Sequence, residues 1–417
     1  MKTYAKTMLA LTALLMVAAI SFILFSGGSS AAADYTTTGD PSLENFMFVK
    51  NIMIWFMLML VAFLMIFIKK YEWGVALAVL LSAAGSFVVY LAIKQFLFGV
   101  AIDEVWNQEL MLMGVICAIT VVIAIGCFLG KLKMWQYLLI GILFAPVFII
   151  VEWFMFGIGT YEGGLFSIFG YNASDAGGSM LVHMCAAYFG LGVAIALREK
   201  RAFNEPMYTT THSVSFVWLA AMLLWVLWPS FVTALLPMEQ VFWGMMVCYM
   251  GGMGSVLSAW VVCTAIQKKV NPLIYTYAML AGPVAIGAPL LMIGPWAAIV
   301  VGLIAGAISA LSFIYLHPWL CKKMGALDVM GVHNLHGVGG WFGAIVAVVM
   351  IVISDIAGAD PLTNLVSAVG VFAISLAFGI VMGFILKATR GKFPDEHMFS
   401  DDADFIKNEE PVEIIVP

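Results

Sequence analysis

The chain has 417 residues, of which 63% are hydrophobic and only 10% are charged. A soluble fold could not cover so much apolar surface with so few charged side chains, so the composition predicts a protein that lies in lipid. The net charge of −5 argues against a nucleic-acid partner. Six cysteines lie in or beside apolar stretches without the spacing of metal ligands, which is typical of small packing residues.

The first 33 residues form a segment of their own. Lys2 and Lys6 precede an apolar stretch from Met8 to Phe25, and small residues follow, ending with alanines at 31–33. This order of charged, apolar and small regions predicts a cleavable signal peptide at 1–33, with an uncleaved extra helix as the alternative. Residues 34–390 then form the membrane domain, and 391–417 form an acidic tail.

Apolar runs of about 20 residues, the length that a helix needs to cross about 30 Å of hydrocarbon, recur along the membrane domain. Eleven runs follow the N-terminal segment, at 45–68, 73–98, 109–129, 135–158, 178–197, 213–236, 240–266, 271–292, 295–320, 331–353 and 363–387. The sequence therefore predicts an all-α membrane protein with eleven transmembrane helices.

The charges of the short loops predict the orientation of these helices. Lysine and arginine follow the first run and every second run after it, at Lys69, Lys70, Lys131, Lys133, Arg198, Lys200, Arg201, Lys268, Lys269, Lys322, Lys323, Lys387, Arg390 and Lys392. The intervening loops carry mainly acidic residues. Because basic loops stay in the cytoplasm, this alternation predicts an N-terminus outside and a C-terminus inside.

A motif occurs once in each half of the chain. Asp175 is followed by Gly178, His183 and the stretch 188–190 (Tyr-Phe-Gly), and Asp328 is followed at the same spacing by Gly331, His336 and 341–343 (Trp-Phe-Gly). With five helices in each half, the first copy begins outside and the second inside, which predicts a five-plus-five inverted repeat. Each histidine lies eight residues beyond its aspartate, or about 12 Å along a helix, so we expect both near the membrane midplane.

Two histidines at equivalent repeat positions favour a substrate path over simple helix bonding, because an ionisable residue deep in a membrane usually faces a cavity or a partner. A neutral imidazole offers one donor and one acceptor nitrogen, so the pair can share a proton and still bind a solute. The expected substrate is small, forms hydrogen bonds and passes this point uncharged, since a bare cation would pay a large desolvation cost.

The other polar residues near the motif have simpler interpretations. For Asp175 and Asp328, capping of a helix start is the favoured reading, with shaping of the access path by Asp175 as the alternative. For His333, a bond to Asn334 or to the backbone is favoured over a place in the lumen. His212, His317 and His397 are expected in solvated or interfacial positions near the cytoplasmic side.

Three separated stretches closely resemble the signature sequences of Rhesus (Rh) proteins in the ammonium transporter superfamily. They are 172–183 (NASDAGGSMLVH), 228–231 (WPSF) and 331–337 (GVHNLHG). The resemblance implies a multi-pass protein of the cell membrane, a homotrimer with one narrow hydrophobic pore per subunit that conducts ammonia, with methylamine and carbon dioxide as further candidates.

The resemblance also implies roles for individual residues. His183 and His336 match the twin pore histidines, Asp175 matches the acidic residue before the fifth helix, and Phe231 matches an aromatic gate at the outer mouth. A second gate phenylalanine is usual in the third helix, where this chain has Ile116 or a neighbour. With Asp328 added from the repeat, these are the candidate transport residues.

Other functions remain as alternatives. An electrogenic ammonium transporter would capture the cation at an outer aromatic site, to which Trp106 and Trp153 could contribute. An ammonium sensor would need an output domain, for which the stretch after the eleventh helix is short. A membrane enzyme or metal site using His183, His333 and His336 is disfavoured, because no carboxylate or cysteine completes the ligand set, so no enzymatic activity, metal or cofactor is expected.

The tail from Lys392 to Pro417 carries eight acidic residues, and we expect it to be a solvated, partly disordered segment, with docking of a cytoplasmic regulatory partner as the less favoured reading.

Overall fold

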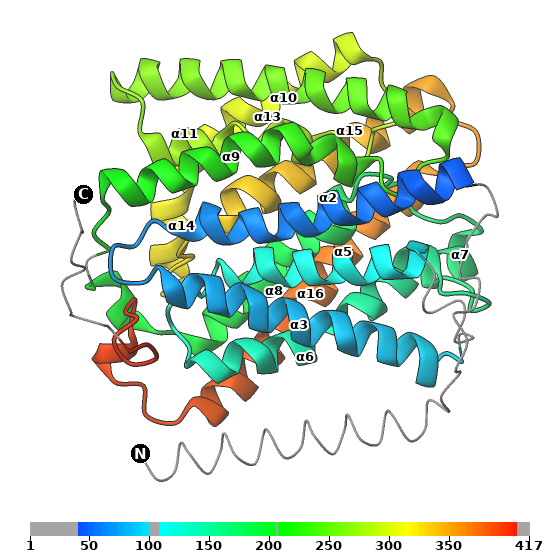
Figure 1. The fold of residues 1–417 in the computed structure, drawn as a ribbon. Helices are drawn as coiled ribbons and strands as arrows, with labels where there is room; N and C mark the ends of the chain where they lie inside the picture. Colours follow the sequence, from blue (N-terminus) through cyan, green and yellow to red (C-terminus); the bar gives the residue numbers. More distant parts are fainter. Residues whose placement is uncertain (1–40, 100–107, 206, 407–417) are drawn as a thin grey trace, which may run out of the picture.

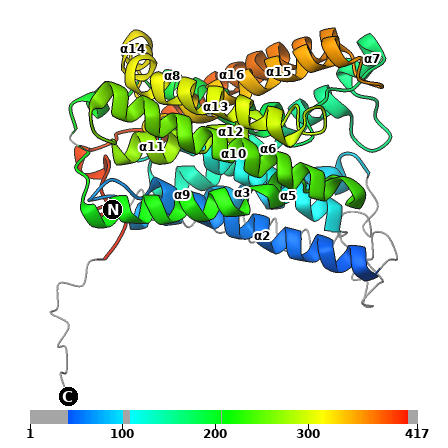
Figure 2. The same cartoon turned by 90° about the horizontal axis from the view of Figure 1, so that it is seen from above.

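The computed structural model describes residues 41–99, 108–205 and 207–406, and the regular secondary structure in these ranges is helical (Figure 1). The predicted signal peptide and Trp106 lie outside the described residues. The helices form one bundle, seen along its side in Figure 1 and from above in Figure 2. The short helix α7 (Gly164–Phe169) marks one end of the bundle, here called the α7 end. Residues 391–406 pack at the opposite end, called the tail end.

Ten helices in the described residues are long and apolar enough to cross a membrane. They are α2 (Pro41–Met65), α3 (Trp73–Phe96), α5 (Gln108–Ile125), α6 (Met134–Phe156), η1 (Ser179–Met184) continued by α8 (Cys185–Leu197), α9 (Thr211–Val232), α10 (Met238–Gln267), α13 (Pro295–Leu311) continued by η3 (Ser312–Leu316) and α14 (His317–Met324), η4 (His333–Gly337) continued by α15 (Val338–Ser354), and α16 (Pro361–Arg390). Two short 3-10 helices, η2 (Lys200–Phe203) and η5 (Asp395–His397), lie at the tail end. Ten of the eleven predicted segments are thus continuous helices.

The eighth predicted segment, 271–292, is not one continuous helix. It consists of α11 (Pro272–Ala278) and α12 (Ala281–Ala285) followed by turns. Its broken backbone bonds to the turn before η1: Ser179 Oγ donates to the Val284 carbonyl at 2.6 Å and accepts from the Ala288 N–H at 2.8 Å. The Gly177 N–H donates to the Gly287 carbonyl at 2.8 Å. Non-helical backbone is tolerated at membrane depth only where protein satisfies it in this way.

Both copies of the repeated motif begin with the same local structure. Gly178 and Gly331 have positive φ angles of 79° and 67°, which glycine adopts without a steric penalty. A π-helical turn, η1 or η4, follows each glycine and carries the histidine. The equal spacing in sequence therefore corresponds to equal geometry in the fold.

The two copies enter the bundle from opposite ends. Asp175 lines a cavity together with Glu109, which lies in the first turn of α5. The second copy contacts the other end of the same helix, where the Val329 N–H donates to the Cys127 carbonyl at 3.2 Å. Because α5 connects the α7 end to the tail end, the motifs are antiparallel, as the inverted repeat requires.

The helix that carries His183 is the most enclosed span, with 94% of its most apolar window buried. It packs backbone to backbone against α16. A methyl group on Gly379 would collide with the Phe189 carbonyl, and one on Gly192 would collide with the α16 backbone at Leu376. Glycine allows this close approach, which is a common way for membrane helices to associate.

The described part of the acidic tail is not a free, solvated segment, and this corrects the expectation for 391–406. Phe393, Met398 and Phe399 are buried, and the Phe399 N–H donates to the Gly130 carbonyl at 3.2 Å. Asp401 accepts from the backbone N–H groups that open α3, those of Glu72, Trp73 and Gly74, at 3.0, 3.0 and 2.8 Å. Apolar side chains and a carboxylate at a helix start thus anchor a segment whose acidic composition alone predicts solvation.

An ion cluster fixes the same end of the bundle. The Glu199 carboxylate accepts from Arg201 at 2.8 Å and from Arg390 at 3.2 Å, and Arg201 also pairs with Asp395 in the tail. The hydrogen bonds from the Arg201 guanidinium hold the pKa of Glu199 below its usual value. The tail, the loop after α8 and the end of α16 therefore form one connected surface.

Replacing Asp401 with alanine is expected to lower the unfolding midpoint of the purified protein, because three N–H groups at the start of α3 lose their acceptor. The expected loss in the free energy of unfolding is about 1–2 kcal/mol, as for other helix caps. Thermal unfolding followed by intrinsic fluorescence measures it. Asp401→Asn keeps one of the two accepting oxygens and should lower the midpoint by less, and an unchanged midpoint for Asp401→Ala would show that the tail does not stabilise α3.

Candidate functional site

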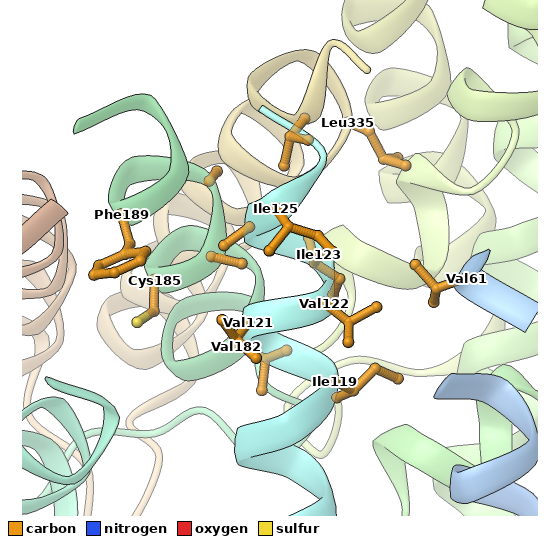
Figure 3. Close-up of a cluster of buried hydrophobic side chains, with 14 of the residues drawn as sticks. Val61, Ile119, Val121, Val122, Ile123, Ile125, Val182, Cys185, Phe189 and Leu335 are labelled. Atoms are coloured by element: carbon orange, nitrogen blue, oxygen red, sulfur yellow. The ribbon is translucent and has the colours of Figure 1, made fainter. Parts of the chain in front are cut away.

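A narrow cavity of about 50 Å³, called the central cavity, lies inside the bundle. It is lined by Met57, Val61, Leu64, Met65, Ile119, Ile123, Gly126, His183, Leu224, Trp228, Phe231, Tyr277, Leu280, Phe313, Met330, Gly331, Val332, Leu335 and His336. Figure 3 shows part of its apolar wall, where Ile119 and Ile123 of α5 extend toward Val61 of α2. The lining side chains are aliphatic, thioether and aromatic, and their polar groups are two imidazoles, one indole N–H and one phenol.

The two imidazoles form a pair in this cavity. The Nδ1 atoms of His183 and His336 lie 3.1 Å apart, and the rings stack with centroids 5.0 Å apart and planes at 26°. Both side chains are buried, at 2% and 8% exposure. A short Nδ1 to Nδ1 contact requires one ring to donate and the other to accept, so the pair fits two neutral imidazoles that share one hydrogen bond. His183 Nε2 has no hydrogen-bond partner in the described protein.

Aromatic rings from α9 cover His183. Its ring centroid lies 5.7 Å from that of Trp228 and 5.9 Å from that of Phe231. Among the described residues, Phe231 alone lines both the central cavity and a second, larger cavity of about 560 Å³ at the α7 end, called the vestibule. The Phe231 ring therefore separates the two spaces.

The vestibule carries the acidic groups that the central cavity lacks. Glu109, Glu152 and Asp175 line it, and so does Ile116. Glu152 pairs with the buried Lys94 at 2.9 Å and accepts from the Tyr90 hydroxyl at 3.1 Å. The vestibule is thus wider and more polar than the central cavity.

Asp175 and Asp328 both cap the starts of their helices, as expected. Asp175 Oδ2 accepts from the N–H groups of Met180 at 2.9 Å and Leu181 at 2.8 Å. Asp328 accepts from those of Val332 and His333, both at 3.0 Å. Asp175 also lines the vestibule, whereas Asp328 lies at the tail end and lines neither of the two cavities. Asp328 is therefore not brought together with the histidine pair.

For the remaining histidines, the expected bond between His333 and Asn334 is wrong. Asn334 does not bond to His333: its side chain lies 2.9 Å from His317 Nδ1 and accepts from Ser312 Oγ at 2.7 Å. His317 is therefore half-buried and bonded, because the π-helical turn η3 brings it against η4. The His333 ring packs edge to face on Tyr188 at 5.6 Å and does not line the central cavity.

The sequence patterns did not identify several residues of the site. Tyr277 and Phe313, with ring centroids 5.8 Å apart, line the central cavity beyond the histidines. Lys50 and Lys94 are buried in α2 and α3, and a search for lysines inside apolar runs would have found both. By contrast, Trp153 does not line the vestibule, and its indole donates to the Glu162 carbonyl at 2.9 Å.

The fold and the site together define a multi-pass helical membrane protein with a histidine pair in an apolar internal cavity. The family model of the Ammonium Transporter Family matches residues 6–407, so the chain belongs to that family.

Individual relatives share both sequence and fold with this chain. The chain is 30% identical over 351 residues to the ammonium transporter Rh type A of Bos taurus, a match that covers 81% of this chain and 78% of the relative. It is similar to the solved structure of Nitrosomonas europaea Rh50, with a TM-score of 0.80 and 30% identity over 89% of this chain and 95% of that one. A solved sensor Amt protein shares the fold, with a TM-score of 0.74 at 18% identity over 87% and 97% of the two chains.

Replacing Asp175 with alanine is expected to expose the start of η1, because the N–H groups of Met180 and Leu181 lose their acceptor. Hydrogen–deuterium exchange of a peptide covering 178–184 measures this as faster amide exchange. Asp175→Asn keeps an acceptor oxygen and should exchange at nearly the wild-type rate. Equal exchange in Asp175→Ala and the wild type would rule out the cap.

Proposed function

We propose that this protein is a channel that passes ammonia, as the neutral molecule, across a cell membrane. The observation that carries the proposal is the His183–His336 pair inside a cavity whose other walls are almost entirely apolar. The α7 end faces outward and the tail end faces the cytoplasm, because the basic loops lie at the tail end. Together with the ten continuous helices, the broken segment of α11 and α12 brings the number of transmembrane elements to eleven.

The apolar lining of the central cavity favours neutral ammonia over ammonium. The cavity holds no carboxylate that could pair with a cation, so a bare ammonium ion would lose its hydration without compensation, at a cost of several kcal/mol. Ammonia carries no charge, and it can donate to or accept from an imidazole nitrogen. The unpartnered Nε2 of His183 supplies one such group.

The vestibule would gather ammonium before the proton is lost. Glu109 and Asp175, which have no lysine or arginine partner among the described residues, attract cations, and the Phe231 face offers a further cation–π contact. The proton then stays on the outer side, and ammonia passes Phe231 toward the histidine pair. Methylamine and carbon dioxide are further candidate substrates, because both are small and can pass uncharged.

The relatives support this function. The Bos taurus protein is named an ammonium transporter, and the Nitrosomonas europaea protein is described with the Rhesus protein family of channels. Both are 30% identical to this chain. We also propose a homotrimer, on the resemblance to Rh proteins, and chemical cross-linking in native membranes would test this number of subunits.

Replacing His183 or His336 with alanine is expected to slow ammonia flux by about threefold to tenfold, because the solute loses a hydrogen-bonding partner in an apolar channel. Stopped-flow measurement of internal pH in proteoliposomes, after an ammonium gradient is imposed, gives the flux. The double variant should resemble the single variants, since the two rings act as one pair.

The matched control is His212→Ala, which changes an exposed histidine at the tail end of α9 and should leave the flux unchanged. Wild-type rates equal to those of empty liposomes would contradict the channel, and unchanged rates in both histidine variants would remove the pair from the path.

A further inference from the structure

A lysine is buried in the half of α2 that lies toward the α7 end. Lys50 is 5% exposed, and its Nζ donates to the backbone carbonyl of Thr233 and, at 2.9 Å, to the Thr233 hydroxyl. The same Nζ lies 4.5 Å from the centroid of the Phe46 ring. In the described part of the chain, no carboxylate pairs with Lys50.

The contacts of Lys50 match the chemistry of an ammonium group. A protonated lysine has three N–H donors, and here a carbonyl, a hydroxyl and the face of a ring can receive them. Thr233 is the C-terminal capping residue of α9, where unsatisfied carbonyls give the helix end a partial negative charge. Lys50 therefore caps α9 from a neighbouring helix, a contact between residues 183 positions apart.

The capped turn is the turn that carries Phe231. Pro229 lies inside α9 and has no N–H, so the helix loses a hydrogen bond just before its end. The Thr233 hydroxyl and N–H both donate to the Pro229 carbonyl, at 2.7 and 3.1 Å. Thr233 thus closes the last turn of α9, which follows the turn that Pro229 weakens, and Lys50 holds Thr233 in place.

We propose that Lys50 is a positioning residue that fixes the Phe231 ring between the vestibule and the central cavity, and so determines how large an amine can pass. The inference rests on the proposed function, because it concerns selection at the same channel. Phe231 lines both cavities, so a small displacement of its helical turn changes the opening between them. Without the cap, the Phe231 ring moves more freely, and the flux of a larger amine increases more than the flux of ammonia does.

The test compares methylamine flux with ammonia flux in proteoliposomes, using stopped-flow pH measurement for both. Lys50→Met is expected to raise the methylamine-to-ammonia ratio by about threefold to tenfold, the size of effect expected from losing one ordinary hydrogen bond. Lys50→Arg keeps N–H donors and the charge, and its ratio should lie closer to that of the wild type than the ratio of Lys50→Met. Thr233→Val removes the hydroxyl alone and should raise the ratio less.

Two controls separate this role from general loss of stability. Lys131→Met changes another buried lysine that donates to backbone carbonyls, those of Cys127 and Leu327, but at the tail end, and it should leave the ratio unchanged. Thr233→Ser keeps both hydroxyl bonds and should behave like the wild type.

A ratio that stays at the wild-type value in Lys50→Met and Thr233→Val would overturn the inference. If Lys50→Met does not fold, a wild-type ratio in Thr233→Val alone would overturn it. Failure of the channel function would look different, because wild-type liposomes would then match empty ones for ammonia itself.

Discussion

One hydrogen bond between two imidazoles lies at the centre of this structure, with the Nδ1 atoms of His183 and His336 3.1 Å apart. Each ring reaches this point from a different end of the bundle, through its own glycine with positive φ and its own π-helical turn. Each turn is capped by an aspartate, Asp175 or Asp328. The pair forms only if both π-helical turns lie at the correct depth. The hydrogen bond between the two rings therefore depends on the geometry of both halves of the bundle.

Room for this pair comes from unusual backbone elsewhere. The segment from α11 to α12 is broken, and its free carbonyl and N–H groups bond to Ser179 and Gly177 beside η1. Glycines 192 and 379 bring α8 and α16 into backbone contact behind the histidine. The enclosed helix, the broken helix and the glycine contact are therefore parts of one arrangement that surrounds an apolar passage.

Charge is distributed unevenly along the passage. Carboxylates line the vestibule, whereas hydrocarbon and aromatic side chains line the central cavity. The change occurs at Phe231, whose helical turn is held by Thr233 and Lys50. A cation is stabilised before this ring and destabilised after it, which favours separation of the proton from ammonia at this point. An electrogenic transporter would need a compensating charge beyond Phe231, and none lines the described cavity.

The sequence predicted those features that depend on local pattern or on the repeat. Hydropathy located ten continuous helices, and equal spacing after Asp175 and Asp328 predicted that the two histidines meet. The sequence did not predict features that depend on contacts between distant residues. Examples are the hydrogen bond from Lys50 to Thr233 and the bonds that Asp401 accepts at the start of α3. It also treated 271–292 as a continuous helix, because apolar composition does not show where the backbone breaks.

The most direct test of the central claim, that the passage conducts neutral ammonia, is to record membrane current and ammonia flux together on wild-type protein in the same bilayer. The account predicts rapid internal alkalinisation with no current above that of protein-free bilayers. A saturable inward current that rises in proportion to the ammonium flux would contradict it, because charge would then be crossing the histidine pair.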